Sequence, residues 1–147
     1  MASRFAVVWL LAAGAVLGIT GLAGIVAGTY LSAWLYSLLP PLIIDAAAVG
    51  GAATASGAAL VGLGIVHLAA GALVRRGMGG AITAAVVLAA TMGVLCIGWG
   101  AAALVSAVAG SGPPVGLLPA GIGLGLVAAG YGWTAHALIG LRAPPNR

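Results

Sequence analysis

Four long runs of apolar residues make up most of this chain and limit what it can fold into. They extend from Phe5 to Gly28, from Ala46 to Val74, from Ala81 to about Ala109 and from Val115 to Leu141. None of them contains Asp, Glu, Lys or Arg. A helix needs about 20 mostly apolar residues to cross a bilayer, so each run is long enough to span. The runs predict an all-α integral membrane protein with four transmembrane helices.

The composition agrees with this interpretation. Charged residues make up 4% of the chain and hydrophobic residues 63%, whereas soluble domains carry about 25% charged residues. Four crossings with short connections use up the 147 residues, so we expect one transmembrane domain over residues 1–147. The start of the chain imitates a signal peptide, but its apolar run is longer than the roughly 7–15 residues of a removable segment, so we expect a retained first helix.

The five arginines all lie at the ends of the apolar runs. Arg4 precedes the first run, Arg75 and Arg76 lie between the second and third, and Arg142 and Arg147 follow the fourth. Cytoplasmic loops of membrane proteins are enriched in arginine and lysine. We therefore expect a multi-pass protein of the plasma (inner) membrane, with both termini and the Arg75–Arg76 turn in the cytoplasm. This placement of the arginines also argues against nucleic acid as a partner.

The first outer connection contains aromatic residues followed by a helix-breaking pair. Tyr30, Trp34 and Tyr36 precede Pro40 and Pro41. Tyrosine and tryptophan are enriched at membrane interfaces, and proline cannot continue a helix. This segment predicts an aromatic belt at the outer interface, followed by a turn.

Asp45 is the only acidic residue, and it directly precedes the second run. A carboxylate there is expected to cap the second helix, because it can accept backbone N–H groups at the positive end of the helix dipole. An ion site at the outer face is the alternative, but no second carboxylate is present to complete it. The chain also lacks Lys, Glu and Gln. Its residues assemble no metal cluster, phosphate loop or catalytic triad, so we expect a protein that is not an enzyme.

Glycine, with 26 residues, gives the strongest pattern. Small residues recur at helical spacing as Gly14, Gly18, Gly21 and Gly28 in the first run, Gly50, Gly57, Gly64 and Gly71 in the second, Ala89, Gly93, Cys96, Gly100 and Ala107 in the third, and Gly121, Gly125, Ala128 and Gly132 in the fourth. Helices in lipid associate where small residues let their backbones approach. These stripes therefore predict packing faces, either within one bundle or against other subunits.

Two features indicate a tandem repeat of helical hairpins. A shift of 73 residues superimposes Pro40-Pro41 on Pro113-Pro114. Each half also ends in a histidine, a glycine four residues later and then arginine, beginning at His67 and at His136. The spacing from the proline pair to the histidine differs by four residues between the halves, so chance alignment of glycine-rich sequence is the alternative.

His67 and His136 are ionisable groups inside apolar runs, at similar distances from the arginines that follow them. Such residues in membrane helices often mark a function. If the second and fourth helices are neighbours, the two imidazoles could ligate a b-type haem. Hydrogen-bonded packing is the simpler interpretation, and a proton-linked role is a third.

The favoured function is an accessory or assembly subunit without cofactor, whose partners are the lipid bilayer and either further copies of itself or other membrane subunits. The alternatives are a haem-binding electron-transfer subunit that uses His67 and His136, and a small carrier for a lipophilic molecule.

Overall fold

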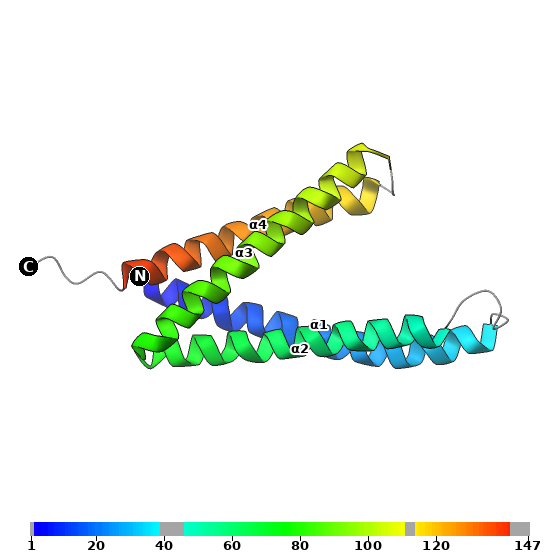
Figure 1. Ribbon diagram of the computed structural model, residues 1–147, viewed down its shortest axis with the longest axis horizontal. Helices are drawn as coiled ribbons and strands as arrows, with labels where there is room; N and C mark the ends of the chain where they lie inside the picture. The colour runs from blue at the N-terminus through cyan, green and yellow to red at the C-terminus, as the bar shows by residue number, and fades with distance from the viewer. Residues whose placement is uncertain (1, 39–45, 111–113, 142–147) are drawn as a thin grey trace, which may run out of the picture. The chain divides into compact units, whose positions relative to one another are not determined.

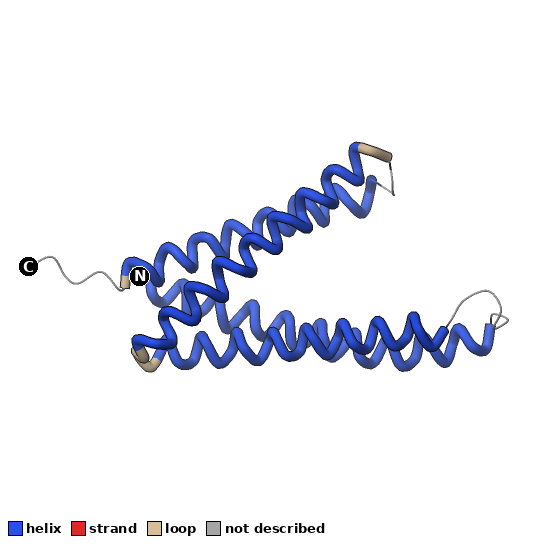
Figure 2. Tube along the Cα trace, in the orientation of Figure 1, coloured by secondary structure: helices blue, strands red, loops and turns tan. Residues whose placement is uncertain are grey.

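The computed structural model describes residues 2–38, 46–110 and 114–141. These described residues form four α-helices joined by short connections: α1 (Ala2–Leu38), α2 (Ala46–Arg75), α3 (Gly79–Val108) and α4 (Pro114–Gly140) (Figures 1 and 2). Each helix contains a segment long and apolar enough to cross a membrane, namely Arg4–Tyr30, Ala48–Arg75, Gly79–Val108 and Gly116–Gly140. The prediction of an all-helical chain with four such helices is confirmed.

Helix α1 continues ten residues past the predicted end at Gly28, as far as Leu38. Tyr30 and Trp34 therefore lie on the helix, not in a connection as the sequence analysis placed them, and both are exposed. Nothing after Gly28 breaks the helix until Pro40, and a residue that precedes proline is disfavoured in helical backbone. Pro40, Pro41 and the expected cap Asp45 lie outside the described residues.

The chain divides into two compact units, which are described separately. Leu10–Ala69 forms the α1–α2 unit, in which most of α1 packs against most of α2. Met1–Trp9 together with Ala70–Arg147 forms the α3–α4 unit. In the second of these, α3 and α4 are in contact, and the first residues of α1 pack against α4.

Helices α2 and α3 are joined by a tight turn at Gly77, whose φ of +74° is a left-handed conformation that favours glycine. The N–H of Gly77 donates to the Val74 carbonyl (3.0 Å), and the N–H of Met78 donates to the Leu73 carbonyl (3.3 Å). These two bonds form a Schellman motif, which satisfies carbonyls at the end of α2. The turn therefore has a defined backbone, and α3 begins immediately after it at Gly79.

Small side chains form the contact between α3 and α4. The buried residues of α3 are Ala85, Ala89, Gly93, Cys96 and Gly100. A Cβ added to Gly100 would lie 3.2 Å from the Gly121 carbonyl oxygen, and one added to Gly93 would lie 3.5 Å from the Tyr131 Cβ. The two helices therefore approach closely along this stripe.

Candidate functional site

Glycines of α1 and α2 face one another in pairs within the α1–α2 unit. Gly14 lies against Gly64, Gly21 against Gly57, and Gly28 against Gly50. All six residues are buried. Residue numbers rise along α1 as they fall along α2, so the helices run antiparallel, and successive pairs are seven residues apart in both.

The seven-residue period keeps every pair in contact because seven residues make nearly two turns of an α-helix, so the stripe drifts by only about 20° per repeat. The contact joins backbone to backbone. A Cβ added to Gly21 would lie 2.6 Å from both the Gly57 carbonyl oxygen and the Val61 nitrogen. A Cβ added to Gly64 would lie 2.8 Å from both the Gly14 carbonyl oxygen and the Gly18 nitrogen. No other residue fits at these positions without separating the helices.

The side chain of Thr54 on α2 packs against Gly28 of α1. The Thr54 hydroxyl donates to the Gly50 carbonyl at 2.9 Å, one turn back on its own helix. The hydroxyl proton is therefore bonded within α2. The Thr54 oxygen lies against Gly28 of α1, where an added Cβ would come within 2.6 Å of it.

The structure does not bring all the predicted packing residues together. An added Cβ on Gly18, Gly125 or Gly132 would meet nothing within 4 Å among the described residues, although the Gly18 backbone lies close to Gly64. Gly125 and Gly132 are exposed, whereas Gly121 and Ala128 of the same stripe are buried. Gly71 is buried in the α3–α4 unit, and Ala107 is half-buried. The α4 stripe is thus divided between a face that contacts α3 and a face that is open.

An aromatic cluster that the sequence analysis missed joins the first residues of α1 to α4. Trp9 stacks on Phe5, with ring centroids 6.0 Å apart, and meets Tyr131 edge to face at 6.0 Å. Its indole lies directly against Gly130, where an added Cβ would overlap the ring. The indole Nε1 is buried and has no hydrogen-bond partner among the described residues. The Thr134 hydroxyl, also buried, donates to the Gly130 carbonyl at 2.9 Å.

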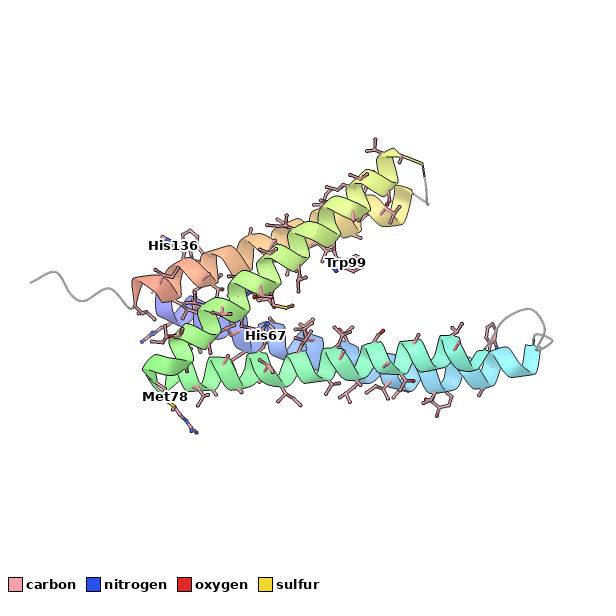
Figure 3. All side chains as sticks on the ribbon, in the orientation of Figure 1. His67, Met78, Trp99 and His136 are labelled. Atoms are coloured by element: carbon pink, nitrogen blue, oxygen red, sulfur yellow. The ribbon has the colours of Figure 1, made fainter. Side chains whose placement is uncertain are left out.

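The two histidines have different surroundings. His67, in the α1–α2 unit, is fully buried, and its Nδ1 lies 2.8 Å from the Leu63 carbonyl oxygen. Because a carbonyl only accepts, Nδ1 carries the proton in this bond. His136, in the α3–α4 unit, is exposed and lies beside Trp133, with ring centroids 6.4 Å apart (Figure 3). Ligation of one haem by both histidines stays an untested alternative.

Among the described residues, no three His, Cys, Asp or Glu side chains gather into a potential metal site. An apolar hollow of about 350 Å³ is lined by Leu104, Val105, Val108 and Ala109. Three of these residues belong to the last turns of α3 and Ala109 directly follows them, so the hollow is a feature of that end of the helix rather than an enclosed ligand cavity.

The described residues define a class: an all-helical arrangement with four helices that are long and apolar enough to cross a membrane. No protein family, curated protein or solved structure matches this chain.

Proposed function

We propose that this chain is a multi-pass membrane protein without a catalytic site, in which glycine contacts shape two helical hairpins that present apolar faces to lipid and to other subunits. The positions of the arginines support a cytoplasmic location for both termini. The single observation that carries the proposal is the backbone contact between α1 and α2 at three glycine pairs. Such contacts are the usual means of helix association in lipid, where exclusion of water contributes little.

The outward surfaces support a lipid environment. Large apolar side chains point away from the helix contacts along all four helices, including Ile19 (69% exposed), Val87 (60%) and Leu126 (69%). Soluble monomers seldom expose contiguous apolar patches larger than a few hundred Å². A hydrocarbon solvent would cover these side chains at no cost, because lipid tails are as apolar as the side chains themselves.

A subunit role follows from the small residues that the described contacts leave open. Gly51 and Gly62 of α2, and Gly125 and Gly132 of α4, have room for a Cβ. Two further faces of small residues therefore remain for close approach by other helices. Transport of ions or polar solutes would instead require polar groups near the middle of the membrane, where this chain has only hydroxyls.

Extraction and co-purification test the proposal. The chain is expected to stay in the membrane fraction after an alkaline carbonate wash. After solubilisation in mild detergent, it should migrate as an assembly larger than its own 14.0 kDa plus bound detergent, with stoichiometric further copies or other membrane subunits. Release by carbonate would contradict membrane insertion. A strictly monomeric chain in native membranes, determined by crosslinking before solubilisation, would contradict the subunit role.

A further inference from the structure

The turn between α2 and α3 presents two adjacent arginines from a fixed backbone. Arg75 is the last residue of α2, Arg76 follows it, and both side chains are exposed. The Schellman bonds at Gly77 and Met78 hold the backbone directly after them. The two arginine side chains therefore project from defined backbone positions. Only the side chains have to become ordered when an anion binds.

No side-chain carboxylate of this chain can neutralise the pair. Asp45 is the only acidic residue, and it directly precedes the first residue of α2, whereas Arg75 is the last. The first and last residues of α2, Ala46 and Arg75, are about 44 Å apart at 1.5 Å per residue. This distance is several Debye lengths at physiological ionic strength. The counter-charge for Arg75 and Arg76 has to come from outside the side chains of this chain.

The surroundings of the pair indicate which anion meets it. Met78, two residues further on, is 52% exposed, and Figure 3 shows it at this turn (Figure 3). The adjoining segments Ala48–Arg75 and Gly79–Val108 are both apolar enough to span. In a bilayer, the turn would place the two guanidinium groups at the level of the lipid headgroups while Met78 contacts acyl chains. Guanidinium binds phosphate with paired, charge-assisted hydrogen bonds.

We propose that Arg75 and Arg76 form a binding site for the headgroup of an anionic phospholipid, in which the guanidinium N–H groups donate to phosphate oxygens. Basic clusters at the cytoplasmic end of membrane helices attract anionic lipids in this way. A zwitterionic headgroup fits less well because its own ammonium already balances its phosphate. The inference rests on the membrane insertion proposed above.

Lipid binding to the whole chain in phosphatidylcholine nanodiscs tests the site, with a spin-labelled phosphatidylglycerol as probe. Preference for the probe over labelled phosphatidylcholine is expected in the native chain and should decline as salt is raised. The double variant Arg75→Gln/Arg76→Gln should bind the anionic probe roughly tenfold more weakly. The matched control Arg142→Gln/Arg147→Gln removes the same charge from the C-terminal tail and should weaken binding less than the turn variant does, because it leaves the paired guanidinium groups in place.

Three outcomes would overturn the site. The native chain could bind both labelled lipids equally, which requires no variant and is independent of any folding defect. The two double variants could lose the same affinity, which would indicate a diffuse effect of net charge. Millimolar inorganic phosphate could displace the probe from the native chain, which would assign the arginines to a soluble anion. None of these results affects the proposed subunit role, because that role fails only if the chain leaves the membrane or stays monomeric there.

Discussion

Gly57 of α2 lies directly against Gly21 of α1, so closely that a Cβ on Gly57 would come within 2.6 Å of the Gly21 carbonyl oxygen and 2.7 Å of the Ile25 nitrogen. Both of these neighbours are backbone atoms of α1, which cannot move aside as the end of a flexible side chain could. Any larger residue at this position has to push the two helices apart.

Gly57→Ala should therefore destabilise the α1–α2 contact, at a cost of about 1–3 kcal/mol, the usual range for overpacking a filled interior. Gly62→Ala is the matched control, because it makes the same change on the same helix where an added Cβ meets nothing within 4 Å. In chains dispersed as monomers in detergent, where no other subunit covers Gly62, this change should not be destabilising, because alanine favours a helix over glycine by about 1 kcal/mol. Reversible unfolding in mixed detergent micelles measures both. Equal losses would rule out the glycine contact as the cause.

The placement of the arginines predicts the topology. Single cysteines at residues 75–80 and 142–147, introduced into a Cys96→Ala background, should react with impermeant maleimide only from the cytoplasmic side. Cysteines at residues 32–38 should react from the outer side, because the first connection carries no arginine. Labelling of the Arg75–Arg76 turn from outside in intact cells would show that the orientation is reversed.

The contact between Trp9 and Gly130 predicts a second position at which a glycine cannot be replaced without loss of stability. Gly130→Ala should destabilise the α3–α4 unit by about 1–3 kcal/mol, because the added methyl group overlaps the indole of Trp9. The same change at Gly132, two residues further along α4, has open space and should not be destabilising in chains dispersed as monomers in detergent, where no other subunit covers it.

The double variant Trp9→Leu/Gly130→Ala then separates this contact from a general effect at Gly130. With the indole removed, the alanine should cost less than it does in the native background, giving an interaction energy of about 0.5–3 kcal/mol. Additive effects in thermal unfolding would mean that Trp9 does not lie against Gly130 in the folded protein.

Haem ligation by His67 and His136 is tested by colour. We expect the purified protein to be colourless, because His136 is exposed beside Trp133, whereas His67 is buried and bonded to the Leu63 carbonyl. A Soret band that shifts on reduction and disappears in both His67→Ala and His136→Ala would contradict this expectation and support the electron-transfer alternative.

Hydropathy alone located the four helices, because a span of the hydrocarbon core needs a long uncharged run whatever it packs against. The end of α1 at Leu38 was less predictable. Aromatic residues such as Tyr30 and Trp34 are equally suited to an interfacial loop and to a helix that continues through the interface, and only the proline that follows limits the helix.

The packing site could be predicted only in part, and the reason is geometric. Helical periodicity determines which residues of one helix share a face, and it placed Gly50, Gly57 and Gly64 on a single stripe. It does not say which stripe meets another helix, or in what register. The pairing of Gly57 with Gly21 depends on atoms from two helices that are distant in sequence.

The sequence by itself determined that this chain forms long apolar helices, where its charges fall and where small residues align. Only the tertiary structure decided that Gly121 and Ala128 of α4 are buried while Gly125 and Gly132 stay open, and that Trp9 occupies the space beside Gly130. A glycine on a helix permits close approach but does not require it, so its role is decided by the neighbour that fills or leaves empty the space where its side chain would be.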